Sequence, residues 1–180
     1  MNYLCVFCGS ASGKKDKFTE VALNLGQEMS NKNIGLVYGG ASIGVMGAVA
    51  DGVLRSAGEV IGVIPQAIVD LEVSHKNLTH LHIVDSMHTR KEKMYQLSNG
   101  FVALPGGMGT LDELCEIVTW AQLKFHTKPI YVLNQDGFYD HLMAHFRSIC
   151  ENGFLKKEHL DFVREVKTVQ ELLDDYSSVI

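Results

Sequence analysis

Short runs of apolar residues alternate along this chain with longer stretches in which apolar residues recur every three or four positions. Such short runs are typical of β-strands, and the wider spacing is typical of amphipathic helices. The runs lie at Tyr3–Cys8, Gly35–Tyr38, Val60–Ile64, Leu81–Val84, Phe101–Leu104 and Ile130–Leu133. Because several of them are almost continuously apolar, we expect a parallel sheet with helices on both faces.

The alternating order of strands and helices predicts a doubly wound, Rossmann-like α/β fold in a single domain over residues 1–180. Near the end, a weaker strand at Phe162–Val166 precedes a helix at Thr168–Tyr176 that Thr168 could cap. Neither an internal repeat nor a low-complexity linker divides the chain. The least regular stretch is Gln66–Thr79, whose length favours a binding loop or lid.

Length, composition and charge narrow the class of protein. The 180 residues are 46% hydrophobic, which is enough to fill the core of one globular domain. A formal net charge of -5 and a pI near 5.9 argue against a surface adapted to a nucleic-acid backbone. The sequence shows neither a secretion signal nor an apolar segment of membrane-spanning length. We therefore expect a soluble, cytoplasmic protein without nucleic-acid or membrane partners. If it binds phosphate, it must do so in a confined site rather than on a broad basic surface.

The cysteines and histidines predict neither a disulfide framework nor a metal site. Four scattered cysteines are too few for the framework of a small secreted domain, so we expect free thiols. Cys5 and Cys8 form a C-x-x-C pattern, but at this spacing on a strand they would point to opposite faces. The histidines that could share a face lack an evident third ligand: His80 with His82, and His141 with His145.

Three of the predicted strands run directly into glycine-rich sequence, at Gly9–Gly13, Gly39–Gly44 and Pro105–Thr110. The carboxyl ends of the strands in an open parallel sheet border the ligand crevice, so all three turns could face one site. Glycine lets backbone N–H groups approach an anion, and a helix N-terminus adds unpaired donors with a favourable dipole. One such turn could serve tight packing alone, whereas the three together favour a phosphate site.

The third turn is the strongest case, because Thr110 could both cap the following helix and donate its hydroxyl to a phosphate oxygen. The sequence has no G-x-x-x-x-G-K-[ST] P-loop, and the second turn lacks the later acidic residue of a dinucleotide fingerprint. A mononucleotide or sugar phosphate is therefore a better expected ligand than NAD or ATP. No cofactor is predicted.

Charged residues near the turns could perform chemistry. Glu113 lies three residues after Thr110, so its carboxylate can reach a ligand whose phosphate rests at the helix N-terminus. Arg90 and Lys91 lie near the start of another helix, where cations oppose the dipole, and an anionic ligand would account for them. The structural alternatives are a glutamate that complements the helix dipole and a solvated face for the two cations.

The run from Pro105 to Glu113, PGGMGTLDE, matches the PGGxGTxxE signature of the Lonely Guy family, whose members are often labelled possible lysine decarboxylases. Further segments that resemble the family follow its order over most of the chain: Val6–Ser10, Tyr38–Gly47, Gly62–Pro65, Met87–Lys91 and Thr119–Leu123. The resemblance implies hydrolysis of the N-glycosidic bond of AMP or of cytokinin riboside 5'-monophosphates, which yields the free base and ribose 5-phosphate. It also implies a homodimer whose site is completed near the subunit interface.

Carried over by position, the resemblance also implies the site residues. Arg90 and Glu113 look like the family's catalytic pair. The implied contacts to the nucleotide and its phosphate are Gly39, Gly40, Glu72, Lys91, Gly106, Gly107, Met108, Gly109, Thr110 and Thr119. The chain departs from the family at Ala41, Met108 and Asp112, and it lacks the proline-arginine pair that many relatives carry before the position of Glu72. That last departure bears on which base the protein prefers.

Two other functions are the alternatives to this reaction. Decarboxylation of lysine with pyridoxal phosphate needs a Schiff-base lysine, and Lys91 is the only candidate near the predicted crevice. A non-enzymatic nucleotide sensor could share the fold, but it would have no need of both Arg90 and Glu113. Hydrolysis of a nucleoside 5'-monophosphate is therefore the predicted function.

Overall fold

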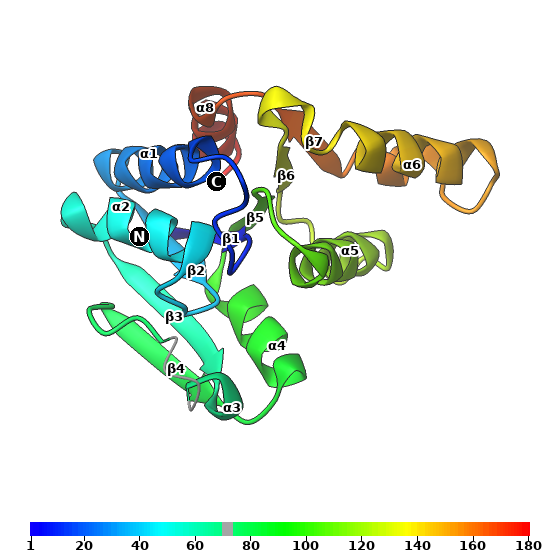
Figure 1. Ribbon diagram of the computed structural model, residues 1–180. Helices are drawn as coiled ribbons and strands as arrows, with labels where there is room; N and C mark the ends of the chain where they lie inside the picture. Colours follow the sequence, from blue (N-terminus) through cyan, green and yellow to red (C-terminus); the bar gives the residue numbers. More distant parts are fainter. Residues whose placement is uncertain (70–73) are drawn as a thin grey trace.

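The computed structural model describes residues 1–69 and 74–180, which contain one seven-stranded sheet (Figure 1). All neighbouring strands are parallel, and their order across the sheet is β4-β3-β2-β1-β5-β6-β7. The strands are β1 (Asn2–Phe7), β2 (Ile34–Tyr38), β3 (Val60–Pro65), β4 (His80–Val84), β5 (Gly100–Ala103), β6 (Ile130–Leu133) and β7 (Val163–Val166). The first six overlap the six apolar runs of the sequence and β7 overlaps the weaker predicted strand, so the predicted Rossmann-like fold is confirmed.

Helices cover both faces of this sheet (Figure 1). One face carries α1 (Lys17–Asn31), α2 (Gly44–Arg55) and α8 (Val169–Val179), and the other carries α4 (Met87–Leu97), α5 (Met108–Gln122) and α6 (Asp140–Glu151). The remaining helical segments are short: α3 (Gln66–Val69), the 3-10 turn η1 (Gln135–Gly137) and α7 (Lys157–Leu160). As predicted, Thr168 caps α8, because its Oγ1 accepts a hydrogen bond from the N–H of Glu171 at 3.1 Å.

Side chains that alternate along the strands divide the core into two halves. Leu4, Val6 and Cys8 belong to the half under α1, α2 and α8, whereas Cys5 and Phe7 belong to the half under α4, α5 and α6. The two cysteines therefore point to opposite faces, as predicted, and both are free thiols. Burial raises the pKa of each thiol, so both act as core residues rather than nucleophiles.

The edge strand β4 is not among the strands that are buried on both faces. Leu81 and Ile83 of this strand are 39% and 52% exposed. This strand lies at the margin of the sheet, where β3 pairs with it on one side. An apolar run identifies a strand, but its neighbours decide how much of it is buried.

The central strand β1 is the point at which the direction of winding reverses. Strands β2, β3 and β4 follow on one side of it, and β5, β6 and β7 lie on the other. Open α/β sheets bind ligands outside the carboxyl ends of the strands at such a switch point. That position lies beyond the ends of β1 and β5, where the chain runs into Gly9 and Gly106. No helix in the described ranges is both long and apolar enough to cross a membrane.

Candidate active site

The three glycine-rich turns lie against one another at the switch point, as predicted. The N–H of Gly9 donates a hydrogen bond to the carbonyl of Pro105 at 3.2 Å, which joins the first turn to the third. The carbonyl of Gly9 accepts a hydrogen bond from the N–H of Met46 at 3.2 Å. A Cβ added to Gly44 would lie 2.4 Å from the carbonyl of Ser10, so the second turn packs directly on the first.

Helix α5 begins earlier than the sequence predicted. Gly107 is the N-cap, with an extended backbone (φ -98°, ψ -153°), so Met108 is the first helical residue. Thr110 is the third residue of the helix and is buried, and the prediction that it caps α5 was wrong because the backbone leaves the helix at Gly107. The Oγ1 of Thr110 instead lies beside Gly106, where an added Cβ would be 2.1 Å away. Glu113 consequently lies on the second turn of α5.

Gly107 and Gly109 are glycines that the protein's own packing does not require. A Cβ added to either one would meet no other heavy atom within 4 Å, and neither has the positive φ that favours glycine. Both lie at the N-terminus of α5, where the first backbone N–H groups have no partner within the helix. An anion that comes close to those N–H groups would account for glycine at both positions.

Gly109→Ala is expected to separate ligand binding from folding. Alanine in a helix is about 0.5–1 kcal/mol more favourable than glycine, and the space is free, so the Tm should rise. The added methyl group would occupy the space in front of the N–H groups, so the affinity for AMP should fall about tenfold, the loss of roughly one hydrogen bond. Thermal unfolding and isothermal titration calorimetry measure the two effects.

Gly106→Ala is the matched control for this prediction. Its methyl group would lie 2.1 Å from Thr110 Oγ1, so this variant should lower the Tm. Unchanged AMP affinity in Gly109→Ala would show that the ligand does not use the space at the start of α5.

The predicted catalytic pair is in contact, although its members come from different helices. Arg90 Nη1 lies 3.1 Å from Glu113 Oε1, and the two side chains are only 11% and 7% exposed. Arg90 Nε donates a hydrogen bond to the carbonyl of Val63 in β3 at 3.1 Å. The guanidinium also lies against the second turn, where a Cβ added to Gly39 would be 2.1 Å from Nη2. A strand carbonyl, a glycine and a carboxylate therefore fix the position of the guanidinium.

The carboxyl group of Glu113 titrates near neutral pH. Burial raises its pKa to about 7, and the Arg90 guanidinium acts in the opposite direction without outweighing burial. The neighbouring carboxylate of Asp112 raises the pKa further. A buried carboxyl group with a perturbed pKa beside a fixed cation is typical of a functional site.

Lys91 links helices α4 and α5 beside this pair. Its Nζ lies 3.0 Å from carboxylate oxygens of both Asp112 and Glu116, and its side chain is 10% exposed. Burial lowers the pKa of Lys91, but the hydrogen bonds to the two carboxylates outweigh burial and raise it. Sequence reasoning did not single out Glu116; its place one helical turn after Asp112 was the available signal.

Other predicted contact residues lie at different distances from the start of α5. Met108 is 79% exposed at the first position of the helix. Thr119 is far from that position, because its distance from Thr110 along the helix axis is about 13 Å at 1.5 Å per residue. Its exposed hydroxyl donates a hydrogen bond to the Cys115 carbonyl at 2.7 Å. Glu72 lies outside the described residues.

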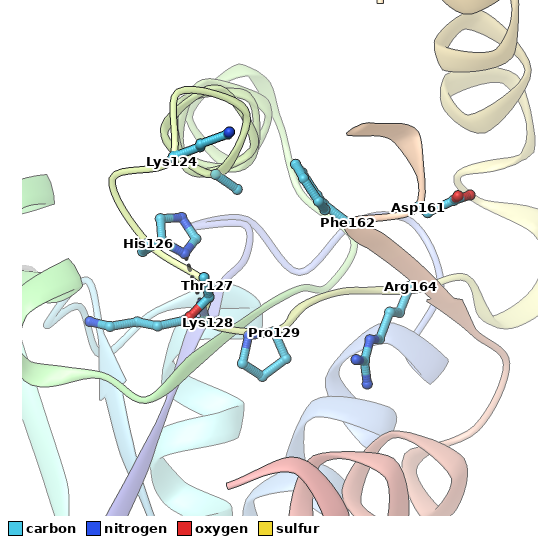
Figure 2. Close-up of a pocket in the computed structure, with 9 residues that line it drawn as sticks. Lys124, His126, Thr127, Lys128, Pro129, Asp161, Phe162 and Arg164 are labelled. Atoms are coloured by element: carbon cyan, nitrogen blue, oxygen red, sulfur yellow. Dashed lines mark hydrogen bonds between the residues drawn. The ribbon is translucent and has the colours of Figure 1, made fainter. Parts of the chain in front are cut away.

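A cavity of about 410 Å³ lies at the opposite end of the sheet, before β6 and β7 (Figure 2). Two of the cations in its lining already have partners within the protein. Lys128 points away from the cavity and donates to the Tyr95 carbonyl at 2.7 Å, and Arg164 pairs with Asp175. The cavity is distinct from the site at the glycine turns, where, among the described residues, the N-terminus of α5 lies near the buried Arg90–Glu113 pair.

The fold is Rossmann-like, and the site places glycine turns and the N-terminus of α5 at the switch point of the sheet. Its fold matches that of the molybdenum cofactor binding protein of Rippkaea orientalis, with a TM-score of 0.76 over 99% of this chain and 96% of that chain, at 19% identity. Residues 46–176 match the family model described as possible lysine decarboxylase.

Relatives of higher sequence identity identify the family. A probable cytokinin riboside 5'-monophosphate phosphoribohydrolase of Oryza sativa subsp. japonica is 45% identical over 94% of this chain and 76% of its own length. A cytokinin riboside 5'-monophosphate phosphoribohydrolase of Arabidopsis thaliana is 42% identical over 97% of this chain and 82% of its own length. The chain belongs to the Lonely Guy family, as its motifs implied.

Proposed function

We propose that this protein is a nucleoside 5'-monophosphate phosphoribohydrolase. It would use water to cleave the N-glycosidic bond of AMP or of an N6-substituted adenosine 5'-monophosphate, and release the free base and ribose 5-phosphate. The observation that carries the proposal is the buried Arg90–Glu113 pair, with 3.1 Å between its charged atoms, on the helices that border the phosphate cradle. Relatives at 42% and 45% identity carry the name of this reaction.

The site's geometry suggests a role for each group. The substrate phosphate would accept hydrogen bonds from the N–H groups at the start of α5 and lie near the Thr110 hydroxyl. Cleavage of a glycosidic bond passes through an oxocarbenium-like state in which positive charge grows on the sugar. Ionised Glu113, further along the same helix, would stabilise that charge or orient the attacking water. The water supplies a hydroxyl group to the anomeric carbon of the ribose and a proton to the departing base.

Arg90 would have two roles in this reaction, one toward Glu113 and one toward the substrate. Its guanidinium holds the Glu113 carboxylate in one orientation through the contact at 3.1 Å. The guanidinium has further N–H donors, which could bind the phosphate or stabilise negative charge on the departing base.

The residues of the site do not fit pyridoxal phosphate, the cofactor that a lysine decarboxylase would need. A lysine that forms a Schiff base must first lose its proton. Lys91 is held 3.0 Å from each of two carboxylates, and these contacts raise its pKa. The site therefore keeps this lysine protonated and unsuited to that role.

We also propose, from the family resemblance, that the working form is a homodimer in the cytoplasm whose small-molecule partner is the nucleotide. Light scattering of the purified protein tests the assembly. A mass near 20 kDa would contradict a dimer, since one chain is 19.9 kDa.

Chromatography of the products tests the reaction. The pure protein is incubated with AMP and, separately, with isopentenyladenosine 5'-monophosphate, and we expect free base and ribose 5-phosphate from at least one of them. The corresponding nucleosides are the controls, and they should remain intact because they lack the phosphate that the cradle binds. Binding of AMP without release of base would instead favour the nucleotide sensor.

A further inference from the structure

The chain segment just before β4 contacts the glycine turn that follows β2. The N–H of His75 donates a hydrogen bond to the carbonyl of Gly40 at 2.9 Å. Next to this bond, Ala41 and Ser74 form an isolated antiparallel bridge. The turn that contacts Arg90 is therefore bordered by backbone from a segment more than thirty residues later in the sequence.

The imidazole of His75 also makes hydrogen bonds that hold this segment in place. The ring is buried, and its Nδ1 accepts a hydrogen bond from the N–H of Asn77 at 3.2 Å. An accepting Nδ1 carries no proton, so Nε2 bears the hydrogen of the ring. That Nε2 lies 3.2 Å from Oδ1 of Asp51, on α2, and donates to it. The side chain thus ties the returning segment to the helix that the same glycine turn opens.

The position of this turn determines the space available to Arg90. A Cβ on Gly39 would overlap with Arg90 Nη2, so the backbone of the turn lies in direct contact with the guanidinium. Gly40 has a φ of +79°, and its hypothetical Cβ would lie 3.1 Å from Ile64. The guanidinium is therefore confined between the turn and the Val63 carbonyl of β3. A shift of the turn would change the 3.1 Å contact between Arg90 and Glu113.

We infer that His75 and Asp51 are positioning residues for the hydrolytic reaction. The pair, here called the His75–Asp51 clamp, holds the Gly39–Gly40 turn against Arg90 and thereby keeps the guanidinium aligned on Glu113. This inference rests on the proposed function. Neither residue touches the substrate; both act through the turn.

Substitutions of Asp51 test the clamp without replacing any residue of the turn or the cradle. Asp51→Ala removes the acceptor for His75 Nε2 and is expected to lower kcat about tenfold, because small displacements of catalytic groups have effects of this size or larger. KM should change less than kcat, because the start of α5, where the phosphate would bind, is unchanged. Asp51→Asn keeps an acceptor oxygen and is expected to restore most of kcat.

Arg55→Ala is the matched control. Arg55 is the other partner of Asp51, at 3.6 Å, and its side chain is 63% exposed. This variant removes an ion pair of the same carboxylate but leaves His75 bonded, so it should keep wild-type kcat. A loss of kcat in Arg55→Ala equal to that in Asp51→Ala would assign the effect to the charge of α2 and overturn the inference.

A second variant tests the role of the His75 imidazole. His75→Asn can still accept the N–H of Asn77 but is too short to reach Asp51, so its kcat should match that of Asp51→Ala. The double variant should be no worse than either single one, because both remove the same contact. Additive losses, or a wild-type kcat in Asp51→Ala, would overturn the clamp. A role in stability alone would lower the Tm and leave kcat unchanged at temperatures well below it.

Amide hydrogen exchange separates failure of the clamp from failure of the proposed function. The N–H of His75 is bonded to Gly40, so it should exchange faster in Asp51→Ala than in the wild type or in Arg55→Ala. If the wild-type protein releases no base, the proposed function fails and this comparison still decides the clamp. Equal exchange in all three proteins would overturn it.

Discussion

Glu113→Gln is expected to lower kcat for nucleotide hydrolysis by about 100- to 1000-fold, the loss typical of removing one group that stabilises transition-state charge. The amide has nearly the same shape as the carboxyl group, so the buried site should keep its packing. Affinity for AMP is expected to stay within about threefold of the wild type, because the carboxylate acts on charge that develops only in the transition state. Release of free base and calorimetric titration with AMP measure these two quantities.

Asp112→Asn is the matched control for this variant. Asp112 precedes Glu113 on α5, but its side chain is 59% exposed and is paired with Lys91. Loss of this exposed charge should have a far smaller effect on kcat. Full turnover by Glu113→Gln would remove Glu113 from the mechanism, whereas a large loss of AMP affinity would make it a binding residue instead.

The pH dependence of kcat/KM is the second large effect that the structure predicts. Glu113 is active in the proposed mechanism only when ionised, and burial raises its pKa to about 7. Below that pH, kcat/KM should fall about tenfold for each pH unit, and above it kcat/KM should level off. Initial rates at AMP concentrations well below KM, between about pH 5 and pH 9, measure the profile. A rate that increases toward low pH would mean that protonated Glu113 is an acid catalyst.

The same pKa predicts a gain of stability in Glu113→Gln. The pKa is about 7 in the folded protein against an ordinary value of 4.5, a difference equivalent to about 3 kcal/mol. Between these pH values the folded protein binds more protons than the unfolded chain, so this group lowers wild-type stability as the pH rises. Glutamine does not titrate, so Glu113→Gln does not lose this part of its free energy of unfolding as the pH rises.

Chemical denaturation of the two proteins measures the predicted difference. The free energies of unfolding should agree at about pH 4 and differ in favour of Glu113→Gln by roughly 3 kcal/mol at about pH 8. The opposite sign at high pH would show that the attraction of Arg90 outweighs burial.

The sequence by itself determined the elements of the fold and the glycine turns that they present. Apolar runs marked β1 to β6, and a weaker pattern marked β7, because strands that pack against helices carry apolar side chains. Thr168 was recognised as the cap of α8 because capping depends on residues only a few positions apart. The convergence of the three turns also followed, since parallel strands bring their carboxyl ends to one edge of the sheet. These properties depend on periodicity, local geometry or the direction of the strands.

Only the tertiary structure decided which residues share contacts. The residue pattern by itself offered Arg90 and Glu113 separately, each with a plausible structural role, and only the family resemblance paired them. The packing of α4 beside α5 makes them a buried ion pair. Sequence reasoning missed His75 and Asp51 as a pair, because a hydrogen bond between a loop and a helix has no periodic signal. The exposure of β4 and the start of α5 at Gly107 also depended on neighbours and backbone angles. Residue patterns encode local structure, whereas the pKa of Glu113 and the position of Arg90 arise from burial and contacts that exist only once the chain has folded.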